Sequence, residues 1–190
     1  MPSAFAKKLA GIAQKQYDLY HFDSEADPPL AKQIERYWTD LSLKFPGVST
    51  AWSAVFVSWC VEQAGATSAE FKFNPAHSQF VYAAIQNGLH STGVFRAFSV
   101  ESYAPQIGDI IQNNRGGNTF SFDYARTHRS YESHSAIVVE TGVDSKGGYA
   151  TTIGGNESDS VRMKLVRLTN KGLVKQRTNS PFICVIQDLK

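Results

Sequence analysis

The chain has 190 residues, of which 42% are hydrophobic, and its 19 basic and 17 acidic side chains give a formal net charge of +2. This length and composition suffice for one complete hydrophobic core, so we expect a single domain over residues 1–190. The chain has no long basic run, and no apolar run approaches the ~20 residues that span a bilayer. We therefore expect neither a nucleic-acid partner nor membrane insertion.

The first half of the chain has the periodicity of helices, with apolar residues at three- and four-residue steps and with proline, asparagine and glycine at the expected ends. Four helices are predicted, over 4–20, from Pro29 to about Leu43, from a cap at Ser49 or Thr50 to Gly65, and from a cap at Asn74 to near Gly88.

The second half is rich in Ile, Val, Thr and Tyr between clusters of Gly, Asn, Asp and Ser, which predicts a meandering antiparallel sheet. Strands are predicted near 108–113, 135–142, 149–154, 161–168 and 182–188. Helices followed by strands favour the α+β class. The stretch from Asn113 to Ser133 has little periodicity and is predicted to be a long loop, of the kind that often forms a lid or binding loop.

Three segments carry motifs in a fixed order. Thr50–Gly65 contains Trp-Ser followed by small and apolar residues and ends in Gln-Ala-Gly, Pro105–Ile111 contains Pro-x-x-Gly-Asp, and Ser133–Val139 is a strand that begins with Ser-His. Together they resemble the bacterial NlpC and CHAP superfamily of papain-like amidohydrolases and peptidases, over roughly residues 48–157. The chain looks most like members that carry Trp-Ser where their relatives carry Trp-Cys.

The resemblance implies a papain-like α+β fold in which Ser53 takes the nucleophile position and His134 is the base. A nucleophile in the first turn of a helix gains from free backbone N–H groups and from the positive end of the helix dipole. Since we expect the cap at Ser49 or Thr50, Ser53 lies three or four residues past it. Cys60 is the alternative nucleophile, but a mid-helix cysteine among apolar residues favours an inert core position.

A third group should orient the imidazole. A turn centred near Ser145 would pair the His134 strand with the next one and place Asn156 opposite His134, with Glu157 as the substitute if the register differs. Similar hydrolases carry an asparagine or an acid at this position. Trp52 and His77 are further candidates for binding the substrate. Tryptophan is more often a core anchor, and capping or packing explains His77 equally well.

No cofactor or metal is expected. His128, Glu132 and His134 have suitable atoms for zinc, but their spacing matches no helix-borne metal motif. Cys60 and Cys184 are the only cysteines, and both fall in segments expected to be buried, so neither a disulfide nor a cysteine zinc site is predicted.

The leading hypothesis is a peptidoglycan hydrolase that cleaves amide bonds of the stem peptide, a substrate class implied by the resemblance. The start of the chain lacks the apolar core of a secretory signal. We therefore expect synthesis in the cytoplasm and delivery to the periplasm or cell wall by other machinery, as for a phage lysin or an antibacterial effector with an immunity protein. The alternative is a non-catalytic wall-binding protein that has lost the nucleophilic thiol.

Overall fold

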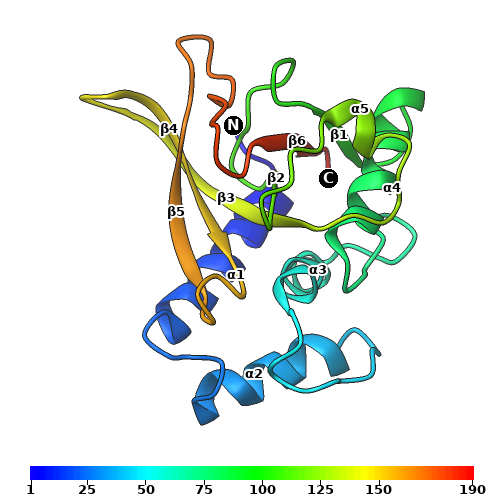
Figure 1. Cartoon of the computed structure of the whole chain (residues 1–190), viewed down its shortest axis with the longest axis vertical. Coiled ribbons are helices and arrows are strands. Elements are labelled where there is room, and N and C mark those ends of the chain that lie inside the picture. The colour runs from blue at the N-terminus through cyan, green and yellow to red at the C-terminus, as the bar shows by residue number, and fades with distance from the viewer.

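The structure, a computed structural model, describes all 190 residues and combines five helices with one six-stranded antiparallel sheet (Figure 1). The helices are α1 (Ala4–Tyr20), α2 (Pro28–Thr39), α3 (Ser53–Ala64), α4 (His77–His90) and α5 (Phe122–Ala125). The strands are β1 (Phe95–Ser99), β2 (Ile110–Asn114), β3 (Ser133–Asp144), β4 (Gly147–Gly154), β5 (Arg162–Arg167) and β6 (Phe182–Asp188). The predicted α+β class, with helices mostly before strands, is confirmed.

Four predicted helices are present, but two begin later than their sequence signals indicated. The predicted cap of α3 at Ser49 or Thr50 is wrong, because the helix starts at Ser53 and Trp52 is its N-cap. The predicted cap of α4 at Asn74 is also wrong. The Asn74 side chain instead accepts a hydrogen bond from the Ala76 N–H at 2.9 Å in a turn before the helix. No helix combines the length and the apolar character needed to cross a membrane.

The strand order is β1-β6-β2-β3-β4-β5, and every neighbouring pair is antiparallel. Strands β2 to β5 form the predicted meander, whereas β6 returns to lie between β1 and β2. Strand β1 was not predicted, because its short sequence with Arg96 and Ser99 lacks a sustained apolar alternation. The predicted loop from Asn113 to Ser133 contains the short helix α5.

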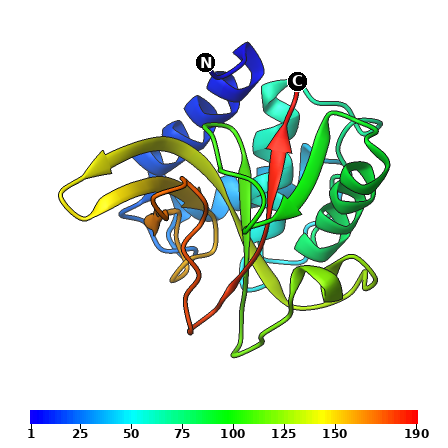
Figure 2. The ribbon, with the colours of Figure 1, turned by 90° about the horizontal axis from the view of Figure 1, so that it is seen from above.

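Helices cover one face of the sheet, and loops cover the other. A cluster of 32 buried residues lies between the helices and the sheet, while a cluster of eight lies on the opposite face, where Tyr103 and Leu168 pack onto it. The β3–β4 hairpin extends beyond the rest of the sheet, and the two termini lie near each other, in both views (Figures 1 and 2). Ten of the 12 residues of α3 are buried, so its polar groups need partners within the protein.

The Pro-x-x-Gly-Asp motif has a structural role at the start of β2. The buried carboxylate of Asp109 accepts backbone hydrogen bonds from Gln106 at 2.8 Å and from Asp188 at 2.9 Å, which ties β2 to the end of β6. Gly108 has a φ of 93°, and a Cβ there would lie 2.6 Å from Ala6 Cα of α1. Burial raises the pKa of Asp109 to about 6 in spite of its hydrogen bonds.

Asp109 should therefore make stability depend on pH. Its native pKa of about 6 exceeds the ordinary 3.8, so its contribution to the free energy of unfolding is full below pH 3.8 and is lost as the pH rises through 6. The difference corresponds to on the order of 3 kcal/mol. In urea unfolding between pH 4 and 7, Asp109→Asn should be less stable than wild type at acid pH and should lose this slope.

The exposed Asp18→Asn variant is the matched control and should keep the wild-type slope. A wild-type slope in Asp109→Asn would contradict the prediction. Burial raises the pKa of Asp188 as well, so the double variant should lose a further part of the slope in the same direction.

Candidate active site

Ser53 is the first residue of α3, at a helix end that no side chain caps. Trp52 makes no side-chain capping hydrogen bond, and the first N–H bonded within the helix is that of Phe56, which donates to the Trp52 carbonyl at 3.0 Å. The N–H groups of Ser53 and Ala54 have no intrahelical acceptor, as expected of a first turn. The start of α3 therefore offers hydrogen-bond donors and positive potential around the serine hydroxyl.

A second helix begins at the same place. His77 is the first residue of α4, which also lacks a side-chain cap, and its Nε2 lies 2.7 Å from Ser53 Oγ. Both side chains are nearly inaccessible, with exposed fractions of 3% for Ser53 and 6% for His77. The structure thus joins two uncapped helix starts through one buried serine–histidine hydrogen bond.

Burial lowers the pKa of His77 well below its ordinary value of 6.5, and repulsion from His134 and Arg115 lowers it further. The ring is therefore neutral at pH 7 and carries one proton. Its Nδ1 is buried without a partner. Because an orphaned buried N–H is rarer than an under-satisfied acceptor, we assign the proton to Nε2, which then donates to Ser53 Oγ.

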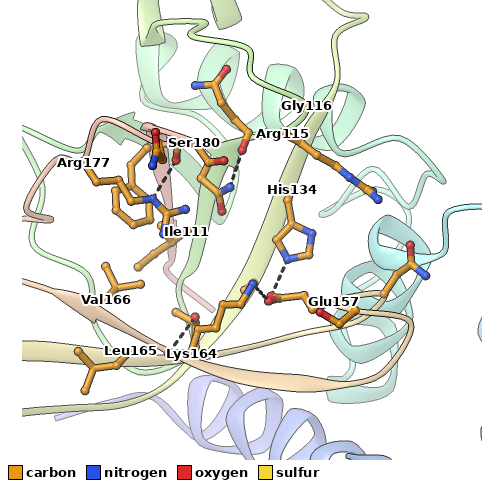
Figure 3. Close-up of a pocket in the computed structure, with 18 residues that line it drawn as sticks. Ile111, Arg115, Gly116, His134, Glu157, Lys164, Leu165, Val166, Arg177 and Ser180 are labelled. Carbon is orange, nitrogen blue, oxygen red and sulfur yellow. Dashed lines mark hydrogen bonds and ion pairs between the residues drawn. The ribbon is translucent and has the colours of Figure 1, made fainter. Parts of the chain in front are cut away.

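His134 belongs to a separate set of interactions with Glu157 and Lys164 (Figure 3). Its Nε2 lies 2.8 Å from Glu157 Oε1, and the Lys164 ammonium contacts the other carboxylate oxygen. Burial alone would raise the pKa of Glu157, but the hydrogen bond and charge of His134, together with Lys164, outweigh it and lower that pKa. Because a carboxylate only accepts hydrogen bonds, Glu157 requires a proton on Nε2 of His134, so in the neutral ring Nδ1 is the unprotonated nitrogen.

The two histidines are neighbours, with ring centroids 5.5 Å apart and an interplanar angle of 63°. No hydrogen bond joins His134 to Ser53, whose partner is His77. The structure therefore links Ser53, His77, His134 and Glu157 in that order, through the Ser53–His77 hydrogen bond, the contact of the two rings and the His134–Glu157 pair.

Asn156 does not orient His134, contrary to the sequence-based prediction. The pairing of Ile137 with Ile153 would place Asn156 opposite His134 if the strands continued, but β4 ends at Gly154. Asn156 then adopts a φ of 55°, and its side-chain amide donates to Glu25 at 2.9 Å. Glu157, which the register argument had left as the substitute, occupies the place beside His134.

Trp52 was predicted to bind the substrate, but it lines neither of the two pockets beside the site. Its side chain is fully buried, its Nε1 donates to the same Glu25 oxygen at 2.9 Å, and a Cβ on Gly155 would lie 2.5 Å from its ring. Glu25 therefore links Trp52, which precedes Ser53, to Asn156, which precedes Glu157. We call this pair of hydrogen bonds the Glu25 clamp. Sequence reasoning missed Glu25, because a loop glutamate 27 residues before Trp52 carries no local signal.

Two pockets open beside these residues and share Arg115. The serine pocket, of about 400 Å³, is lined by Ser53 and His77 together with Tyr131, Glu132 and Ser133. The histidine pocket, of about 550 Å³, is lined by His134 and Glu157 and by residues of β2, β5 and the segment before β6 (Figure 3). Part of the predicted loop thus forms a wall of the serine pocket.

Cys60 is fully buried in the core, and burial raises the pKa of its thiol well above the ordinary value. A protonated, inaccessible thiol is unsuited to nucleophilic attack, which argues against Cys60 as the nucleophile. No group of three or more His, Cys, Asp or Glu side chains is arranged to hold a metal ion.

Residues 26–184 match a family described as uncharacterized protein conserved in bacteria (DUF2272). The chain belongs to this family. The match includes Ser53, His77, His134 and Glu157, while Glu25 lies immediately outside it. No curated protein and no solved structure matches the chain.

The Glu25 clamp can be tested by stability. Glu25→Ala should lower the free energy of unfolding by about 1–3 kcal/mol, because it leaves the buried Trp52 N–H without an acceptor. Glu25→Gln keeps an acceptor oxygen and should cost less. Glu35→Ala, on an exposed face of α2, is the matched control in urea unfolding. Equal stability of the two alanine variants would contradict the clamp.

The environment of His77 predicts an unusual titration. Its ring should stay neutral at pH 6.5 and protonate only at clearly lower pH, and Arg115→Gln should raise the midpoint by removing a positive charge. Nitrogen NMR of the imidazole rings measures both the midpoint and the protonated nitrogen. Arg126→Gln is the control, since Arg126 pairs with Asp123 and not with His77. A midpoint at or above 6.5 would refute the assignment.

Proposed function

We propose that this protein hydrolyses amide bonds in peptidoglycan stem peptides through an acyl-enzyme on Ser53. The observation that carries the proposal is the buried Ser53–His77 hydrogen bond at two uncapped helix starts, with the His77 ring centroid 5.5 Å from that of the carboxylate-bound His134. The bond type and substrate class rest on the resemblance of the Trp-Ser helix and the Ser-His strand to papain-like wall hydrolases.

In the first step, Ser53 Oγ attacks the amide carbonyl carbon. As the carbon–oxygen bond forms, the hydroxyl proton passes to Nδ1 of His134, whose tautomer Glu157 fixes, while His77 holds Oγ through its Nε2–H. The carbon–nitrogen bond then breaks, and the proton moves from His134 to the leaving amine. Water attacks the ester in the same way and returns the hydroxyl to Ser53. The Ser53–His134 contact would form when substrate binds, as catalytic hydrogen bonds often do.

The developing oxyanion needs donors, and the start of α3 supplies them. The free N–H groups of Ser53 and Ala54 lie in the first turn, where the helix dipole also favours negative charge. A serine requires this help more than a cysteine, because its proton must leave during the attack, whereas a thiol can be ionised beforehand.

A wall-binding protein without turnover is the second candidate. It is favoured by the lack of a hydrogen bond between Ser53 and His134 and by the serine at a position where similar enzymes carry a thiol. In either case we propose that the protein acts at the cell wall, where peptidoglycan lies.

Digestion of purified peptidoglycan, followed by mass analysis of the fragments, tests the proposal. Wild-type protein should release stem-peptide fragments, Ser53→Ala should lose about 10³-fold or more of the rate, and Cys60→Ala should keep its activity if it folds. An inactive wild type that gains activity as Ser53→Cys would instead show an intact papain-like site that has been disarmed, as the second candidate requires, and inactivity of both would reject the hydrolase.

Two further variants identify the base. Glu157→Gln can hold His134 in the wrong tautomer, so it should lower kcat by about 10²–10⁴-fold if His134 takes the proton. His77→Gln retains a hydrogen-bond donor and should lose much less activity. The reverse order of effects would make His77 the base. Circular dichroism of each variant is the control for folding.

A further inference from the structure

The histidine pocket is positively charged in a way that the proposed acyl-transfer chemistry does not use. Three cationic side chains line it, from Arg115, Lys164 and Arg177, against the single carboxylate of Glu157 (Figure 3). That carboxylate is already engaged, because its two oxygens contact His134 and Lys164. The two arginines have no acidic partner within 4 Å.

Arg177 is held in place without being neutralised. Its Nε donates to the Ser180 carbonyl at 2.9 Å, and its guanidinium carbon lies 4.3 Å from the centre of the Phe182 ring. These contacts fix the plane of the guanidinium, while its two terminal nitrogens have no hydrogen-bond partner in the chain. A fixed guanidinium edge is suited to a planar carboxylate, which it binds through two parallel hydrogen bonds.

The rest of the pocket has the character of a peptide site. Ile111, Ala136 and Val166 supply apolar surface, and Asn113 and Asn179 supply side-chain amides that can pair with peptide groups. The volume of about 550 Å³ is within the usual range for small-ligand pockets. His134, the proposed base, lies in the wall of the same pocket.

We propose that the histidine pocket binds the acidic part of a peptide substrate, with a free carboxylate on the guanidinium of Arg177 and the scissile amide near His134. Arg115, at the junction of the two pockets, adds a second positive charge on the path to Ser53. This inference rests on the proposed function and specifies its substrate as a peptide with a free carboxylate on this side of the cleaved bond.

Binding to the 190-residue Ser53→Ala protein tests the inference without requiring turnover. The probes are the dipeptide alanyl-glutamate and its counterpart without carboxylates, alanyl-glutamine amide, and binding is measured by calorimetry and by NMR shifts of the His134 ring. The acid should bind at least 10-fold more tightly than the amide and should shift the His134 signals. Arg177→Gln should weaken acid binding by about 10–100-fold, as expected for loss of a charged hydrogen-bond pair.

Two controls separate this site from a general attraction of anions. Lys175→Gln removes a nearby exposed cation outside the pocket and should leave the affinity within twofold. Inorganic phosphate should compete weakly, and phosphate binding that equals or exceeds peptide binding would overturn the peptide assignment. Equal affinity for the acid and the amide, or no effect of Arg177→Gln, would also overturn it.

Kinetics distinguish failure of the inference from failure of the proposed function. If wild-type protein digests peptidoglycan, Arg177→Gln should raise KM about 10-fold and leave kcat within twofold. Unchanged KM with normal digestion would reject the Arg177 site and keep the hydrolase. Arg177-dependent binding of the acid without any digestion would keep the site and reject the hydrolase.

Discussion

The burial of α3 is the constraint on which the rest of this structure depends. The helix lies between the other helices and the sheet, so its buried side-chain polar groups need partners inside the protein. Trp52 donates to Glu25, Trp59 donates to Asp40, and the Ser58 hydroxyl pairs with the backbone of Asn74. Each contact draws a different loop onto the helix.

The same constraint defines the candidate site. The polar start of a buried helix has unpaired N–H groups and a strong local field, and α4 begins at the same point. Placing Ser53 and His77 at these two starts satisfies the hydroxyl and keeps the imidazole neutral. His134 reaches the region from the sheet, where the turn after β4 supplies the carboxylate that orients it. The helices thus supply Ser53 and His77, and the sheet supplies His134, to the same region of the protein.

The site illustrates why register alone does not assign a third catalytic group. The last pair of β3 with β4 in this direction is Ile137 with Ile153, and the same register, if extended, would place Asn156 opposite His134, as the sequence indicated. The strand ends two residues earlier, and three residues of the following turn, Asn156, Ser158 and Asp159, have positive φ values. This turn directs Asn156 to Glu25 and Glu157 to His134. A shift of one residue in this turn therefore decides whether the neutral amide of Asn156 or the charged carboxylate of Glu157 lies beside His134.

The sequence by itself determined the α+β class and the existence of four helices and most strands. It also determined that Ser53 lies near the start of a helix and His134 near the start of a strand. These features follow from local periodicity and from glycine, proline and asparagine, which act over a few residues. Only the tertiary structure decided that β6 lies between β1 and β2, that Glu25 links Trp52 to Asn156, and that His77 contacts Ser53. Those outcomes depend on contacts between residues far apart in the chain, and local sequence carries no record of which distant polar group will satisfy a buried one.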